Sequence, residues 1–275
     1  MKNNIVAIMY DFDKTLTVKD TIEYSFIPNL KIDACEFWGE TNKFRTENKM
    51  DQVLGYMYMM CKKMREKNMK LSREYLNDMG KEIKLFPGVL DWFDRINEYG
   101  RSLGLEIEHY VISAGLKEII EGTPIGDKFK CVFASEYLYD EDGNAVWPNI
   151  SINSTNKTQF LTRINKGVLD VADDRFNEKM LSEDKRVLFS NMIYLGDGFT
   201  DIPCMQITKD RGGVSIAVYT GDNYNIAKKL YNDGRLNYVA PADYSLDGQI
   251  DTIIKTELKL MAIKNNLLVN EEIAK

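Results

Sequence analysis

The chain has 275 residues, of which 44% are apolar and 28% charged, and these ordinary globular values exclude a disordered chain, a collagen-like chain and a disulfide scaffold. Acidic residues outnumber basic ones by 42 to 36, and the net charge of −6 argues against a nucleic-acid-binding protein, which must neutralise phosphates. The single histidine, His109, excludes mechanisms that need two histidines, such as HExxH zinc hydrolases.

The four cysteines form no CxxC pair, which is typical of reduced thiols in a cytosolic protein. No stretch reaches the roughly 18 apolar residues that a membrane span needs. We therefore expect a cytoplasmic protein that binds neither membrane nor nucleic acid, and no obligate protein partner is predicted.

The first predicted strand is the continuous apolar run Ile5–Tyr10, which fits a strand buried on both faces of a parallel sheet. Residues 18–85 then look helical throughout and are too long for a loop between a strand and a helix. They are interpreted as an inserted helical cap, in which Tyr56–Met60 packs a small core rather than binding a cofactor. The predicted domains are an α/β core of residues 1–17 and 87–275 and a cap of residues 18–86.

The middle of the chain returns to alternating elements after Pro87 and Gly88. A predicted helix (Val89–Tyr99), a strand (His109–Ile112) and a short helix (Lys117–Glu121) follow one another. Residues 131–152 then contain two apolar runs around a turn with Asp-Gly, which predicts a β-hairpin insertion.

The last part of the chain continues the alternation of helices and strands. The predicted helices are Lys157–Lys166, Ile226–Tyr231 and Gln249–Lys264, and the predicted strands are Met192–Leu195, Val214–Val218 and Tyr238–Val239. This order predicts an α/β fold with a Rossmann-like, mostly parallel sheet and helices on both of its faces.

Carboxylates follow two of the predicted strands, where ligands bind in open α/β sheets. Asp11 and Asp13 follow the first strand, and Asp197 and Asp201 follow the strand that ends at Leu195. A polar turn would explain either pair alone, but two such pairs indicate a compensating cation, and oxygen ligands favour Mg²⁺. The glycines beside Asp197 are expected to let the backbone turn sharply and approach a ligand.

Two further segments are suited to binding a phosphate. Ser113, Ala114 and Gly115 follow the middle strand and offer a hydroxyl and backbone N–H groups, although Ser113 could instead cap the next helix. Lys157 begins another predicted helix, where a cation is unfavourable unless an anion lies nearby. The alternative interpretation of Lys157 is a surface lysine.

The order DxDxT, serine, lysine, GDGxxD resembles that of the haloacid dehalogenase-like superfamily, and within it the phosphoserine-phosphatase-like branch, over about residues 5–245. That branch carries a helical cap after the first strand and a hairpin after the serine motif. The resemblance implies that Asp11 is the nucleophile and that Asp13 is first the general acid and then the base. It also implies that Ser113 and Lys157 hold the phosphoryl oxygens.

For the cofactor, the resemblance implies Mg²⁺ held by Asp11, the backbone carbonyl of Asp13, and Asp197. Asp201 would be a further ligand or a partner of the ligands. The implied activity is a Mg²⁺-dependent phosphatase that hydrolyses a small phosphorylated metabolite through an aspartyl-phosphate. The alternatives are a phosphotransferase or phosphonatase on the same scaffold, and a non-catalytic binding protein that kept the fold.

Three residues near the motifs bear on the identity of the substrate, which the sequence does not determine. Lys14 and Thr200 depart from the residues often found in the closest relatives. Asp20 lies nine residues after Asp11, where an acidic residue of phosphoserine phosphatases faces the substrate amine. The alternative is that Asp20 caps the first cap helix, with Thr21, Ile22 and Glu23 as its opening turn.

Overall fold

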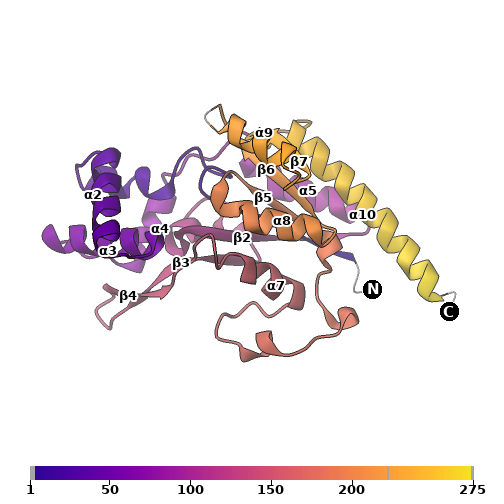
Figure 1. Cartoon of the computed structure of the whole chain (residues 1–275), viewed down its shortest axis with the longest axis horizontal. Coiled ribbons are helices and arrows are strands. Elements are labelled where there is room, and N and C mark those ends of the chain that lie inside the picture. The colour runs from indigo at the N-terminus through magenta and orange to yellow at the C-terminus, as the bar shows by residue number, and fades with distance from the viewer. Residues whose placement is uncertain (1–3, 222, 274–275) are drawn as a thin grey trace.

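The computed structural model describes residues 4–221 and 223–273, with side chains up to residue 266. In this part of the chain, seven strands form one sheet in the spatial order β4-β3-β2-β1-β5-β6-β7 (Figure 1). Neighbouring strands are parallel except β3 and β4. The strands are β1 (Ile5–Tyr10), β2 (Glu106–Leu116), β3 (Cys131–Tyr139), β4 (Ala145–Ile150), β5 (Met192–Gly196), β6 (Val214–Tyr219) and β7 (Tyr238–Pro241). The predicted α/β fold with a mostly parallel sheet is confirmed.

Strand β1 lies at the centre of the sheet and is buried on both faces, as its unbroken apolar run predicts. Its alternate side chains enter two different hydrophobic clusters: Val6, Ile8 and Tyr10 enter one, and Ala7 and Met9 the other. The first cluster is covered by α5 (Val89–Ser102) and α10 (Gln249–Ile273), and the second by α7 (Thr158–Lys166), α8 (Ile202–Asp210) and α9 (Tyr224–Asn232). Helices therefore cover both faces of the sheet.

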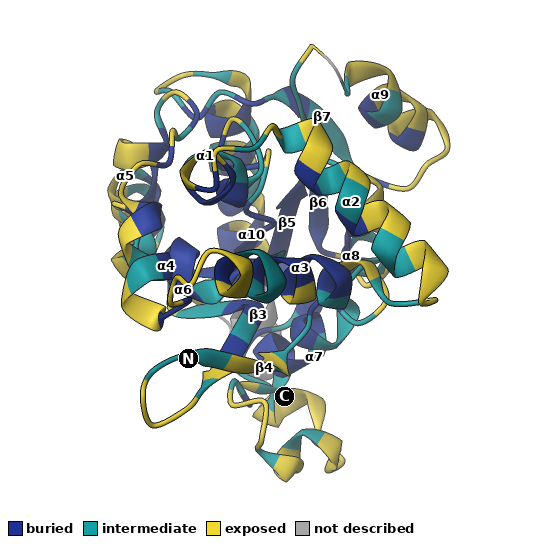
Figure 2. Cartoon of the chain, turned by 90° about the vertical axis from the view of Figure 1, so that its left-hand side faces the viewer, coloured by how far each residue is buried: buried dark blue, intermediate teal, exposed yellow. Residues whose placement is uncertain are grey.

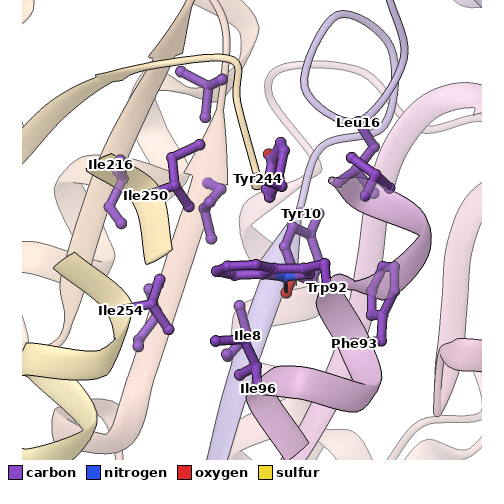
Figure 3. Packing of buried hydrophobic residues seen from close by; sticks show 14 of the residues in the cluster. Ile8, Tyr10, Leu16, Trp92, Phe93, Ile96, Ile216, Tyr244, Ile250 and Ile254 are labelled. Carbon is purple, nitrogen blue, oxygen red and sulfur yellow. Dashed lines mark hydrogen bonds between the residues drawn. The ribbon is translucent and has the colours of Figure 1, made fainter. Parts of the chain in front are cut away.

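An aromatic centre joins β1 to its covering helices on one face (Figure 3). The indole of Trp92 lies against Tyr10, and its Nε1 donates a 2.8 Å hydrogen bond to the Tyr10 hydroxyl. The ring of Tyr244 meets Trp92 edge-on, with 5.3 Å between their ring centroids. Tyr10 in turn bonds Nδ1 of His109 at 3.0 Å, so these large side chains are buried with their polar atoms satisfied.

Residues 21–80 form a group of helices at one end of the sheet (Figure 1). They are η2 (Thr21–Glu23), α1 (Phe26–Asn29), α2 (Ala34–Glu47), α3 (Gln52–Glu66) and α4 (Arg73–Gly80). These helices pack a third hydrophobic cluster, which includes Tyr56, Met57, Met59 and Met60, as the packing interpretation predicted. In Figure 2, α2 and α3 each carry buried and exposed residues, as amphipathic helices do. A bridge between Thr17 and Leu85 closes the group where the chain enters and leaves it.

The predicted hairpin is present as β3 and β4, and it also forms one edge of the sheet because β3 pairs with β2. The short helix α6 (Lys117–Glu121) has the predicted bounds. Strand β2, in contrast, is longer than expected and includes residues 113–115. The remaining helical turns are η3 (Gly126–Lys128), η4 (Asp174–Asn177), η5 (Ser182–Asp184), η6 (Phe189–Asn191) and η7 (Phe199–Asp201).

Candidate active site

Asp11 and Asp13 lie in the turn that follows β1 at the centre of the sheet. The backbone N–H of Asp11 still donates to Leu195 of β5 at 2.9 Å, so Asp11 remains tied to the sheet edge. Phe12 is fully buried in the core between the two acids, and its carbonyl oxygen accepts N–H groups from residues 15–17. This anchored turn holds the Asp11 carboxyl group at the carboxyl end of β1.

Lys157 lies just before α7, and its side chain is fully buried rather than on the surface. Its Nζ lies 2.7 Å from Oδ1 of Asp11 and 2.7 Å from Oδ1 of Asp201. Burial by itself would lower the pKa of Lys157, but the two carboxylates outweigh that effect and raise the pKa above its ordinary value. Lys157 therefore stays charged and partly compensates two buried acids that are far apart in the sequence.

Asp197 and Asp201 follow β5, with Asp201 at the start of α8. Asp11, Asp197 and Asp201 each offer a carboxylate oxygen, and these atoms all lie within 4.8 Å of one another. Burial, with the negative charges of the neighbouring acids, raises the pKa of Asp11 to about 7 and that of Asp197 to about 8. Three acids beside one lysine leave excess negative charge, which a divalent cation would compensate.

Asp201 provides a direct test of whether a cation fits among these acids. Its Oδ1 accepts hydrogen bonds from Lys157 and from the Tyr194 hydroxyl, both at 2.7 Å. Its Oδ2 is buried and has no hydrogen-bond partner among the residues that the structure describes. An unpaired buried carboxylate oxygen is costly, and a hard cation such as Mg²⁺, which prefers oxygen ligands, would satisfy it.

The two glycines beside Asp197 have different roles from those expected. Neither takes a left-handed backbone conformation, so neither is needed for a sharp turn. A Cβ on Gly196 would lie 2.6 Å from Cγ of Asp201, whereas a Cβ on Gly198 would meet no atom within 4 Å. Gly196 therefore makes room for the Asp201 carboxyl group.

Ser113, Ala114 and Gly115 lie inside β2 at a bulge, and not after the end of the strand as expected. Ile112 pairs with Phe133, but Leu116 pairs with Ser135, so three residues of β2 oppose one of β3. Ser113 does not cap α6, since its Oγ accepts the N–H of Gly115 at 3.0 Å. A Cβ on Gly115 would lie 3.0 Å from Oδ2 of Asp13 and 3.3 Å from Oγ of Ser113. The bulge thus brings Ser113 close to the turn that carries Asp13.

Asp13 is held by the first residues after the turn. Its Oδ1 accepts the backbone N–H of Thr21 at 2.7 Å. Burial, followed by the charges of Asp20 and Asp11, raises the pKa of Asp13 to about 8. Asp20 does not cap η2 with its side chain, since its Oδ2 lies 2.6 Å from Nζ of Lys14.

Two residues that support the site were not predicted from the sequence. Tyr194 is a polar residue within the buried run of β5, and a buried tyrosine hydroxyl needs a partner, which was the available signal. Asn223 donates from Nδ2 to the backbone oxygen of Asp197 at 2.8 Å and accepts the N–H of Thr220. No local pattern in the sequence marks Asn223.

A family model described as haloacid dehalogenase-like hydrolase matches residues 8–206, a range that includes all the acids above and Lys157. The chain belongs to this family. An uncharacterized protein of Borreliella burgdorferi is 27% identical to this hydrolase over 271 residues, covering 89% of this chain and 93% of that protein.

Solved structures of other family members show the same fold. A HAD-family hydrolase from Salmonella enterica serovar Typhi superposes with a TM-score of 0.60 at 15% identity, covering 92% of this chain and 71% of that one. A phosphoserine phosphatase described as a phospho-aspartyl intermediate analogue superposes with a TM-score of 0.56 at 16% identity, covering 92% of this chain and 99% of that one.

Within residues 4–221 and 223–273, no helix combines the length and apolar character needed to cross a membrane.

Proposed function

We propose that this hydrolase is a Mg²⁺-dependent phosphatase that hydrolyses a small phosphomonoester through an aspartyl-phosphate intermediate. The observation that carries the proposal is the buried contact of Lys157 Nζ with both Asp11 and Asp201 at 2.7 Å. A buried charge cluster of this kind costs folding free energy and is typical of functional sites. Here it would offset the charge of Asp11 so that an anionic phosphoryl group can approach.

In the first half-reaction, a carboxylate oxygen of Asp11 attacks phosphorus and the bond from phosphorus to the leaving-group oxygen breaks. Asp13 gives its proton to the departing oxygen, and an alcohol leaves. In the second half-reaction, a water oxygen attacks phosphorus while Asp13 accepts a proton from that water. The bond between phosphorus and Asp11 then breaks, inorganic phosphate leaves, and both acids return to their starting protonation states.

The contacts of Asp13 and Ser113 support these roles. The N–H of Thr21 holds Oδ1 of Asp13, and Oδ2 faces the side of Gly115. Because Oγ of Ser113 accepts the N–H of Gly115, the Ser113 hydroxyl proton is free to be donated to a phosphoryl oxygen. Ala114 and Gly115 would line the phosphate position with their backbone.

Asp11, Asp197 and Asp201, with the backbone carbonyl oxygen of Asp13, would hold the Mg²⁺ ion. The bound cation would supply positive charge that stabilises the transferring phosphoryl group. Lys157, which contacts Oδ1 of Asp201, would neutralise part of the negative charge that remains.

We further propose that residues 1–17 and 87–275 form the catalytic core domain and residues 18–86 the cap that covers it. A hollow with walls from both parts supports this division. The described lining from the cap contains no lysine, so it gives no support to the phosphonatase alternative, which requires a cap lysine. It consists of Asp20, Thr21, Ile22, Trp38, Gln52, Val53 and Tyr56.

The test is phosphate release from p-nitrophenyl phosphate by the purified protein with Mg²⁺ and with EDTA. We expect release that depends on Mg²⁺ and is lost in Asp11→Asn. Mass spectrometry of acid-quenched reactions should find phosphate on Asp11. Phosphate binding without release would favour the binding-protein alternative, and phosphorylation of an added alcohol would favour a phosphotransferase.

A further inference from the structure

A hollow of about 110 Å³ lies beside Asp13, where the cap helices meet the turn after β1. It is lined by Asp13, Asp20, Thr21, Ile22, Trp38, Gln52, Val53, Tyr56, Ala114 and Gly115. A cavity of about 150 Å³ accepts a benzene ring. The hollow is smaller than that and has room for about four non-hydrogen atoms of a leaving group beside the proposed general acid.

The two aromatic side chains that line the hollow have their polar atoms bonded to other groups of the protein. Tyr56 donates its hydroxyl to the backbone oxygen of Ala114 at 2.7 Å. Trp38 donates its Nε1 to Glu23 at 2.8 Å. With Ile22 and Val53, these rings present mainly apolar surface to a bound group.

Besides Asp13, the hollow is lined by one other acidic side chain, Asp20, which already forms an ion pair. Lys14 Nζ lies 2.6 Å from Oδ2 of Asp20. Lys14 has a φ of 58°, in the left-handed region, so its backbone takes an unusual conformation directly after Asp13. Partial burial lowers the pKa of Lys14, but the hydrogen bond and the charge of Asp20 outweigh it, and the net pKa lies above its ordinary value.

The pair determines which charges a leaving group can carry. The Lys14 ammonium already occupies Oδ2 of Asp20 and offsets the charge of that carboxylate, so a cationic group gains little by approaching it. An anionic group would meet the carboxyl groups of Asp20 and Asp13 with no unpaired cation described in the lining. An uncharged group meets neither obstacle and contacts the apolar surface of Trp38 and Tyr56.

We propose that the Lys14–Asp20 ion pair makes Lys14 a specificity-determining residue, so that the site selects small phosphomonoesters with an uncharged leaving group. This inference rests on the phosphatase function proposed above. It differs from the sequence-based hypothesis in which Asp20 attracts a substrate amine.

The first experiment compares kcat/KM of the wild-type holoenzyme for three small substrates. Glycerol phosphate has an uncharged leaving group, phosphoethanolamine a cationic one and 3-phosphoglycerate an anionic one. We expect kcat/KM for glycerol phosphate to exceed the kcat/KM for each of the other two substrates by about fivefold or more. This factor is what an exposed ion pair contributes at the upper end of its usual strength. Equal or higher kcat/KM for phosphoethanolamine would overturn the proposal without any variant being made.

The second experiment removes the ammonium group with Lys14→Met, which keeps the Cβ and the same backbone demand. The ratio of kcat/KM for phosphoethanolamine over glycerol phosphate should rise about fivefold because Asp20 is then free to bind an amine. Adding Asp20→Asn to Lys14→Met should cancel the rise. The matched control is Lys81→Met, which breaks the exposed 2.6 Å pair with Asp78 on α4 and should leave the ratio unchanged.

An unchanged ratio in Lys14→Met would overturn the specificity role of Lys14. Absence of phosphate release from every substrate, including p-nitrophenyl phosphate, would instead overturn the phosphatase function. Release with no preference among the three leaving groups would leave that function standing and overturn only the inference about charge.

Discussion

The hydroxyl of Tyr194 donates a 2.7 Å hydrogen bond to Oδ1 of Asp201. Lys157 donates to the same oxygen, so both partners lie on one side of the carboxyl group. The other oxygen, Oδ2, is left buried and unpaired within the described part of the chain. Tyr194 and Lys157 therefore leave Oδ2 as the oxygen of Asp201 that would be available to a cation.

Replacing Tyr194 with Phe should weaken Mg²⁺ binding about tenfold, since a hydrogen bond to a charged group contributes about 1.5 kcal/mol or more. Isothermal titration of Mg²⁺ without substrate measures this directly. Tyr110→Phe is the matched control, because Tyr110 is also fully buried but bonds Glu108. Equal Mg²⁺ affinity in the two variants would contradict the positioning role.

Gly196→Ala should displace Asp201, because the added Cβ would lie 2.6–2.8 Å from three of its side-chain atoms. We expect weaker Mg²⁺ binding and a loss of activity of about 100-fold or more. Gly198→Ala, two residues away, adds a Cβ in open space and should bind Mg²⁺ normally. Normal Mg²⁺ titrations for both variants would show that Asp201 does not need this close approach.

Asp11→Asn should abolish turnover and leave the fold intact, because an amide of nearly the same shape replaces the attacking carboxylate. Lys157 should keep its contact with Asp201 in this variant, because that contact does not involve Asp11. Residual activity above about one per cent corresponds to a rise in the activation free energy of at most about 3 kcal/mol. Such residual activity would exclude the covalent mechanism. Circular dichroism provides the control for folding.

EDTA should remove activity and Mg²⁺ should restore it, because Lys157 alone does not compensate three neighbouring carboxyl groups. Ca²⁺ should restore activity poorly, since it favours looser and higher coordination than Mg²⁺. Asp197→Ala should reproduce chelation. Asp201→Ala should be equally severe or milder in activity and should also lower the melting temperature, because buried Lys157 loses a partner. Full activity in the chelator would remove the metal from the mechanism.

His109 should remain neutral in the folded protein across the physiological pH range. The Tyr10 hydroxyl accepts the Nε1–H of Trp92 and donates its own proton to Nδ1 of His109. The ring proton of His109 is therefore on Nε2, which donates to Oδ1 of Asn97. Burial lowers the pKa of His109 from 6.5 to about 3. Below pH 6.5 the unfolded chain therefore binds a proton that the folded chain does not. This difference lowers the free energy of unfolding by up to about 1.4 kcal/mol per pH unit until about pH 3.

Urea titrations between pH 7 and pH 4 test this expectation against His109→Gln, which has no titrating ring. The loss of stability with falling pH should be smaller in the variant, because the carboxylates contribute equally to both proteins. Parallel curves would show that His109 accepts a proton in the folded state.

The elements of the core were predictable because their signals are local. The run Ile5–Tyr10 is a strand with the predicted bounds, and Lys117–Glu121 is the predicted helix. A strand buried on both faces needs an unbroken apolar run, which is visible in six consecutive letters. The acids of the motifs were visible for the same reason, because Asp11 and Asp197 stand directly after such runs and Asp13 and Asp201 follow within a few residues.

What the sequence by itself determined is therefore the order of the elements, the α/β class and which acids stand at the ends of β1 and β5. Only the tertiary structure decided their partners. Lys157 meets Asp11 across 146 positions of sequence, and Asp20 turns to Lys14 rather than to its own helix. The bulge at Ser113 depends on how β2 pairs with β3. Periodicity reports whether one residue is buried, but a hydrogen bond between distant residues depends on how the elements pack.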